Sequence, residues 1–204
     1  MGYQVAPRSF KQIIKEIINF RDFMCPNNPE YLKIDYFLED LGNIEADLGE
    51  GSVRFSVNYA EINEMPNEYG KTAPYNTNKV IKITIRNDVY EAACNGDTRS
   101  RFTIAHEIGH ALLHSNEQMA FSRSSQNHKT YCDSEWQANV AAALLLPPDH
   151  ANKLLFPHNC VEKCGISHKA AEHTLDNYAK HGFMPSQKEL LKKMLLQINI
   201  SKEF

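Results

Sequence analysis

The chain has 204 residues, 42% of them hydrophobic, and a formal net charge of −3. This length fits about one ordinary domain with a small appendage and argues against two full domains. Because acidic and basic residues are mixed along the whole length, no basic surface is expected to hold a nucleic-acid backbone, and we predict no direct nucleic-acid partner.

The sequence contains no segment suited to a membrane. No uninterrupted apolar run approaches the ~20 residues that a transmembrane helix needs. The cysteines are odd in number and scattered, which favours reduced thiols over a disulfide framework. We therefore predict a cytoplasmic protein with no membrane partner. The cysteines are Cys25, Cys94, Cys132, Cys160 and Cys164.

The first third of the chain contains two helical patterns and a strand. Apolar residues recur with a 3.6-residue period over 8–24, which predicts an amphipathic helix that ends before Pro26. A second short helix fits 31–41, and apolar–polar alternation over 52–59 predicts a half-buried strand. The stretch 61–78 contains several Pro, Gly and Asn residues and is predicted to be an irregular loop.

A regular strand and a long helix follow. Alternation over 79–86 places Ile81, Ile83 and Ile85 on one face of a strand. The period then changes to that of a helix, for which Asp97 is available as the N-cap.

The remaining patterns are mostly helical. After a polar loop over 115–129, Asp133 or Ser134 is a suitable cap for a helix that stops at Pro147. Two further helical patterns occupy 166–180 and 187–199.

These elements predict an α+β fold, with an N-terminal helix, a small sheet and a mostly helical C-terminal part. We divide the chain into one main domain over 1–160 and a helical extension over 161–204 that packs on it.

The segment RFTIAHEIGHALLH places an HExxH pattern inside the long predicted helix. Residues four apart share a helix face at about 6 Å, so His106 and His110 can bind one cation at ~2.0–2.1 Å. Glu107 is turned about 100° around the helix axis, which puts it beside the ion but outside its ligands. The pattern predicts that His106 and His110 bind zinc and that Glu107 is the general base that activates water.

A catalytic zinc ion uses a third protein ligand, and Glu135 is our choice. It lies on the next predicted helix, and residues 111–134 leave enough chain to turn back. Asn139 shares its face and can accept a hydrogen bond from the outer nitrogen of a ligand histidine. Taken alone, Glu135 is equally explained as a first-turn carboxylate favoured by the helix dipole.

Two neighbouring residues compete for the ligand role. His114 lies eight residues from His106, about 12 Å along the axis, so one ion cannot reach both while the helix continues. We interpret His114 as a residue whose charge favours the C-terminal end of the helix dipole. Asp133 lies half a turn off the Glu135 face and is interpreted as an N-cap.

The cysteines offer softer ligands but lack matching neighbours. Cys94 and Cys132 flank the site in sequence and are interpreted as small core residues. Cys160 and Cys164 do not have the CxxC spacing of structural zinc sites, so we predict no second metal.

Beyond the HExxH pattern, the chain resembles the ImmA/IrrE-type metallo-endopeptidases. The similar stretches, within roughly residues 62–148, are ITIRNDVYEAACNGDTR, RFTIAHEIGHALLH and EWQANVAAALLLP. In that family the glutamate of the last pattern supplies the third zinc ligand, and the matching residue here is Glu135. The resemblance implies a zincin-like fold with an edge strand beside the HExxH helix.

The resemblance also implies a cytosolic protease that cuts a protein substrate, a repressor-type transcription regulator. We predict one Zn²⁺ per chain, for which Mn²⁺ can substitute. The alternatives are a catalytically silent zinc-bearing interaction module and a different metal-dependent hydrolase. The presence of Glu107 favours catalysis, because a silent module does not need a base.

Two further expectations concern the substrate. We expect it to lie extended along the exposed edge of the 79–86 strand, adding a strand to the sheet. The donor that stabilises the transition-state oxyanion is left open among several residues. The candidates are His150, His158, His173 and Tyr178.

Overall fold

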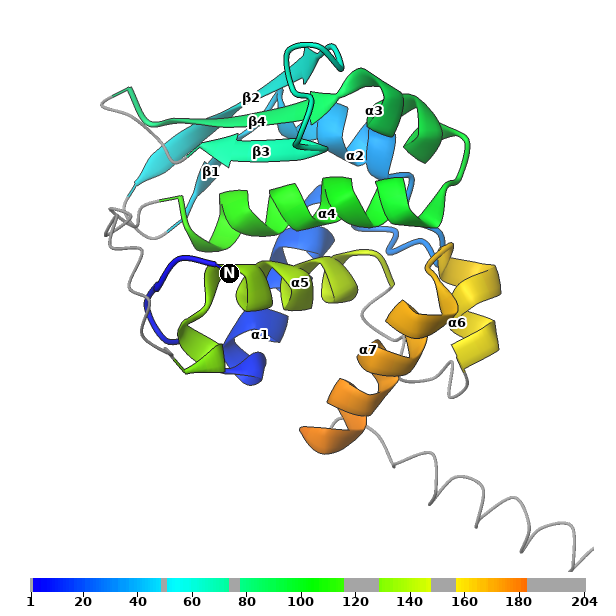
Figure 1. The fold of residues 1–204 in the computed structure, drawn as a ribbon. Coiled ribbons are helices and arrows are strands. Elements are labelled where there is room, and N and C mark those ends of the chain that lie inside the picture. Colours follow the sequence, from blue (N-terminus) through cyan, green and yellow to red (C-terminus); the bar gives the residue numbers. More distant parts are fainter. Residues whose placement is uncertain (1, 49–50, 74–77, 116–128, 148–156, 183–204) are drawn as a thin grey trace, which may run out of the picture.

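The computed structural model describes residues 2–48, 51–73, 78–115, 129–147 and 157–182. Over these residues the chain forms an α+β fold with seven α-helices and one four-stranded mixed sheet, as the sequence predicts (Figure 1). The helix that carries the HExxH pattern, α4 (Thr98–Leu113), lies between the sheet and α5 (Ser134–Leu145). This central position of α4 determines which elements can reach the site.

The two N-terminal helices form where the periodicity predicts them. α1 (Phe10–Met24) begins at a capping box, in which Ser9 and Gln12 each accept a backbone N–H of the other with a side-chain oxygen. α2 (Ile34–Leu41) starts three residues later than the predicted 31–41.

The sheet has the strand order β1-β2-β4-β3. β2 and β4 are parallel, whereas β1 and β3 are antiparallel to their neighbours. The isoleucines at positions 81, 83 and 85 are fully buried, as the alternation predicts. The strands are β1 (Glu45–Asp47), β2 (Ser52–Ala60), β3 (Gly70–Ala73) and β4 (Val80–Arg86).

Two predictions about this sheet are wrong. The stretch 61–78 was expected to be an irregular loop throughout, but it contains β3, which pairs with β4 through Thr72 opposite Ile83. Because β3 occupies the end of the strand order, β4 is an interior strand and not the exposed edge. The edge strand beside the HExxH helix is β3, whose Thr72 hydroxyl lies 2.9 Å from the backbone oxygen of Glu107.

Two short helices were not predicted. α3 (Asn87–Cys94) follows β4 directly and buries Val89 and Ala93. α6 (Pro157–Cys164) buries Cys160 and Cys164. Both are only eight residues long, so their periodicity is weak, and tertiary contacts define them.

The predicted helix caps are confirmed. The side chain of Asp97 accepts the backbone N–H of Ser100 at the start of α4, at 2.7 Å. Asp133 accepts the N–H of Trp136 at the start of α5, at 2.9 Å. A 3-10 turn, η1 (Thr130–Cys132), precedes α5.

The C-terminal part contains α7 (His168–Lys180), close to the predicted 166–180. The helix predicted at 187–199 and nearly all of the loop predicted at 115–129 lie outside the described residues. α6 spans residue 160, and the division of the chain at that residue stays a prediction. None of the helices in the described ranges is long and apolar enough to cross a lipid bilayer.

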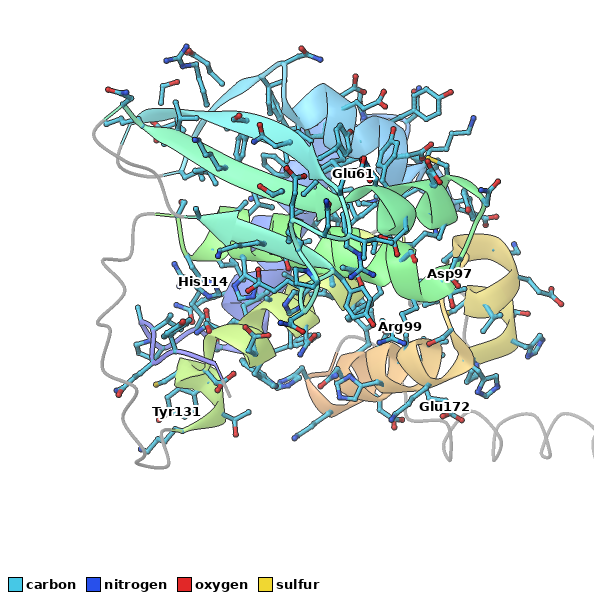
Figure 2. The ribbon with its side chains drawn as sticks, turned by 45° about the horizontal axis from the view of Figure 1, so that its top comes forward. Glu61, Asp97, Arg99, His114, Tyr131 and Glu172 are labelled. Carbon is cyan, nitrogen blue, oxygen red and sulfur yellow. The ribbon has the colours of Figure 1, made fainter. Side chains whose placement is uncertain are left out.

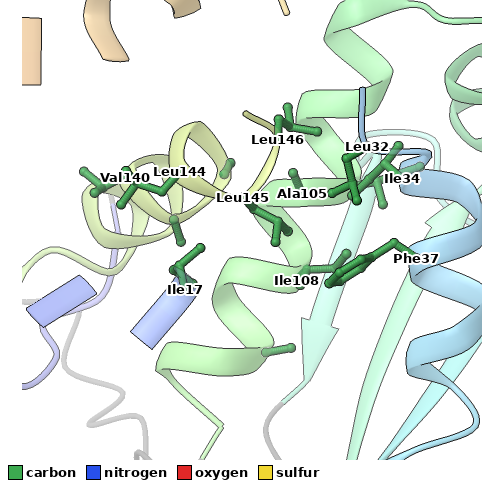
Figure 3. Close-up of a cluster of buried hydrophobic side chains, with 14 of the residues drawn as sticks. Ile17, Leu32, Ile34, Phe37, Ala105, Ile108, Val140, Leu144, Leu145 and Leu146 are labelled. Carbon is green, nitrogen blue, oxygen red and sulfur yellow. The ribbon is translucent and has the colours of Figure 1, made fainter. Parts of the chain in front are cut away.

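The core joins the helices on the inner face of the sheet (Figure 3). Ile17 of α1, Ile108 of α4 and Leu145 of α5 are each at most 1% exposed. Phe37 of α2 packs into the same cluster. The burial of these side chains fixes the positions of α4 and α5 relative to the sheet. It therefore also fixes the positions of the polar residues that these two helices carry outside the core.

Candidate metal centre

Two helices bring three potential metal ligands together. On α4, the Nε2 atoms of His106 and His110 are 3.0 Å apart. Glu135 on α5 places its Oε2 3.3 Å from the Nε2 of His106 and its Oε1 3.3 Å from the Nε2 of His110. Ligand atoms bound at 2.0–2.1 Å to a tetrahedral zinc ion lie about 3.3 Å from one another. One donor atom from each of His106, His110 and Glu135 lies within 4.8 Å of the other two, so these residues can fill three positions of a tetrahedral metal site and leave the fourth for water or substrate.

Close packing of α4 against α5 makes this arrangement possible. A Cβ atom added at Gly109 would lie 2.9 Å from the Cβ of Ala141 and 3.0 Å from the backbone oxygen of Ala138. Small residues on both helices thus allow the backbones to approach closely. As a result Glu135, at the start of α5, reaches the exposed face of α4.

The electrostatics of the three residues favour a positive charge between them. Hydrogen bonding to His106 and His110 holds the pKa of Glu135 far below its usual range, although burial opposes this. Burial alone would lower the pKa of His106, but the carboxylates of Glu135 and Glu107 raise it overall. A divalent cation satisfies the same preference.

Glu107 is held beside the ligands by the edge strand. It is only 8% exposed, and its carboxylate accepts a hydrogen bond from the hydroxyl of Thr72 at 2.8 Å. A Cβ atom at Gly70 would lie 2.7 Å from the Cγ of Glu107. Both β3 residues therefore restrict the position of the Glu107 side chain, which is not one of the three ligands.

Asn139 is placed next to the ligand His106. Its side-chain oxygen lies 3.1 Å from the Nδ1 of His106. Since an amide oxygen only accepts, Nδ1 carries the proton and Nε2 keeps a lone pair directed at the metal position. The structure thus brings together every site residue named from the sequence: His106, Glu107, His110, Glu135 and Asn139.

A comparison with protein families agrees with this geometry. The model of the family Peptidase_M78, described as the IrrE N-terminal-like domain, matches residues 55–176, which is more than half of the chain. The chain belongs to this family. No match was found among curated proteins. Membership of the IrrE N-terminal-like family supports peptidase activity and a bound metal, and the matched range includes all five site residues.

The sequence did not predict the contacts that two further residues of this IrrE N-terminal-like domain make beside His110. His114 follows α4 directly and is buried, with its Nδ1 3.1 Å from the Nδ1 of His110. Its Nε2 lies 3.1 Å from the side-chain oxygen of Gln137, which is also buried. Figure 2 shows His114 at the C-terminal end of α4. The i, i+4 spacing to His110 was visible in the sequence, but nothing there indicated Gln137.

The interpretation of His114 as a charged residue at the helix end is wrong. Burial, with the neighbouring His110, lowers the pKa of His114 to about 3, so its ring is neutral near pH 7. The ligand group does not include His114, which agrees with the prediction from helix geometry that His114 is too far from His106 to bind the same ion.

The alternative ligands take other roles in the described part of the chain. Asp133 caps α5. Cys94 is exposed and Cys132 is half-buried, so their interpretation as core residues is wrong, and neither belongs to the ligand group.

The oxyanion candidates stay unassigned. Tyr178 is buried and packs edge-on against Phe10, and His173 accepts a hydrogen bond from Asn177 in α7. His150 lies outside the described residues.

Proposed function

We propose that this protein is a zinc-dependent endopeptidase that cleaves a protein partner in the cytoplasm. The observation that carries the proposal is the position of Glu107, which is buried beside His106 but outside the His106, His110 and Glu135 ligand group. A metal site needs no such carboxylate for binding alone, whereas hydrolysis needs a base next to the metal. The peptidase family of the chain points to the same chemistry.

When bound, Zn²⁺ supplies Lewis acidity that activates water and polarises the scissile carbonyl. Glu107 would take a proton from the attacking water as its oxygen bonds to the scissile carbonyl carbon. It would then deliver that proton to the amine as the C–N bond breaks, so one carboxylate acts first as base and then as acid. Thr72 orients the carboxylate through its hydroxyl. Asn139 keeps the proton of His106 on Nδ1 and thus keeps Nε2 available as a ligand.

The edge strand suggests how the substrate binds. β3 ends the strand order of the described sheet, and Thr72 connects it directly to Glu107. A peptide that adds to this edge as a further strand would place its carbonyl groups near the base. This mode requires an extended segment, so the proposed substrate is an unfolded or locally opened stretch of a repressor-type transcription regulator.

The variant Glu107→Gln tests the proposal. It keeps the shape of the side chain and removes only the base. The variant should therefore bind metal as the wild type does, while the cleavage rate falls by about 10²–10⁴-fold, the contribution typical of general base catalysis. Products are measured by mass spectrometry with a candidate repressor and with unfolded protein substrates. Glu172→Gln, an exposed change on α7, is the matched control and should cleave normally.

Two results would overturn this function. If wild type loaded with Zn²⁺ or Mn²⁺ cleaves no protein or peptide but binds a partner, the protein is an interaction module. If Glu107→Gln cleaves at the wild-type rate, Glu107 is not the base.

A further inference from the structure

The side-chain amide of Gln137 has a fixed orientation. It is fully buried, and its Nε2 donates to the backbone oxygens of Ala6 and Tyr131, both at 2.8 Å. Both amide hydrogens are thereby used, and the reverse orientation would place Oε1 against two carbonyl oxygens. Arg8, which can only donate, approaches Oε1 at 3.4 Å. Oε1 of Gln137 is therefore an acceptor facing His114.

This acceptor determines which nitrogen of His114 carries the proton. The Nε2 of His114 is 3.1 Å from Oε1 of Gln137 and must donate to it. A second proton on the buried ring would place another cation next to Arg8 on the same amide oxygen, and its Nδ1 would then face His110 as a donor. The neutral ring instead has a lone pair on Nδ1, directed at the Nδ1 of His110.

From this direction of donation we infer that Gln137 and His114 form a hydrogen-bond relay that positions His110, fixing it as the Nδ1–H tautomer so that its Nε2 is free to bind a metal. His110 Nδ1–H donates to His114, and His114 Nε2–H donates to Gln137. The relay does for His110 what Asn139 does for His106, but through a buried intermediate. The relay rests on the proposed function only because that function assigns a metal to His110.

The relay also connects the metal centre to the N-terminal segment, residues 2–8. That segment pairs with the start of α5, where the Val5 N–H donates to the backbone oxygen of Cys132 and the Ser134 N–H donates to that of Tyr3. Through Ala6, it holds the Gln137 amide in the orientation that the relay needs. A ligand on α4 is thus positioned by a segment about a hundred residues earlier in the chain.

The tautomer of His110 can be measured without catalysis. Nitrogen-15 chemical shifts of the histidine rings are recorded on the metal-free full chain, at a pH well above the ordinary histidine pKa of about 6.5. Wild type should show a protonated Nδ1 and an unprotonated Nε2 at His110. Gln137→Met, which keeps the size but removes the amide, should give a mixture of tautomers and about 10–100-fold weaker zinc binding in a chelator competition.

A second variant tests the relay independently, in case Gln137→Met does not fold. His114→Phe removes the acceptor of His110 but leaves Gln137 bonded to the Ala6 and Tyr131 oxygens. It should therefore also give a mixture of His110 tautomers. Asn139→Ala is the reciprocal control and should change the tautomer of His106 while leaving that of His110 unchanged. General loosening of α5 would instead alter both histidines in every variant.

Two outcomes would overturn the relay: a proton on Nε2 of His110 in metal-free wild type, or an unchanged His110 tautomer in both Gln137→Met and His114→Phe. Neither depends on peptide cleavage. A protein that shows the predicted tautomers but cleaves nothing would disprove the proposed function and leave the relay standing.

Discussion

Helices α4 and α5 contribute to the same metal centre in different ways. α4 supplies two ligands and the base from positions 106, 107 and 110, whose relative placement follows from one turn of a single helix. α5 supplies Glu135, Asn139 and Gln137, which reach the centre only because the two helices pack closely at Gly109. The α4 half of the site is therefore a local structure, and the α5 half depends on tertiary packing. Variants that affect only one half can test this difference.

The largest expected effect is the loss of metal in Glu135→Ala. This change removes the only ligand of the assigned group that comes from α5, so the two histidines alone should not retain Zn²⁺. Elemental analysis should fall from one ion per chain to near zero, as it should for His106→Ala or His110→Ala. Added Zn²⁺ should then no longer raise the unfolding temperature.

The control for this change is Glu172→Ala, at an exposed carboxylate on α7. It should leave the metal content at one per chain. Full metal content in Glu135→Ala would show that α5 is not needed for the ligand set and would direct attention to Cys94, Cys132 or Asp133.

A smaller effect is expected from separating the helices with Gly109→Ala. In an ordinary helix this substitution stabilises by about 0.5–1 kcal/mol. Here the new methyl would meet Ala141 and Ala138, at a cost of about 1–3 kcal/mol. We expect net destabilisation in chemical denaturation, together with weaker zinc binding because Glu135 moves away.

Thr103→Ala is a suitable control for Gly109→Ala, since the Thr103 hydroxyl bonds the backbone oxygen of Arg99 within α4. It should keep zinc affinity. If Gly109→Ala stabilised the protein and bound zinc normally, close packing would not be what positions the α5 half.

A third effect concerns the edge strand, which lies outside both helices, and it changes the rate and not the metal content. Thr72→Val keeps the branched shape but removes the hydroxyl that donates to Glu107. A hydrogen bond to a charged group contributes about 1.5–3 kcal/mol, so kcat should fall by roughly 10–100-fold, with unchanged metal content. Thr72→Ser should restore most of the rate, and a normal rate in Thr72→Val would remove this residue from the positioning of the base.

The same division explains what the sequence could predict. The HExxH spacing and the caps Asp97 and Asp133 are local patterns, and a single helix turn is enough to interpret them. Glu135 and Asn139 could be chosen because they share a face four residues apart. Even so, only the packing of α5 on α4 brings them to the histidines.

Gln137 and β3 could not be found in this way. Gln137 looks like any polar helix residue, and its partners Ala6 and His114 are 131 and 23 positions away. The strand residues 70–73, GKTA, show no apolar alternation, and they are extended because β4 offers them a pairing edge. Interactions between distant segments leave little trace in a single sequence.

The two faces of β3 differ in how much substitution they should tolerate. Gly70 and Thr72 stand opposite Ile85 and Ile83 on the inner face and contact Glu107, so any larger side chain there disturbs the base. Lys71 and Ala73 alternate onto the outer face, away from Glu107. Mutant libraries intended to change cleavage preference should therefore randomise positions 71 and 73 and keep 70 and 72 constant.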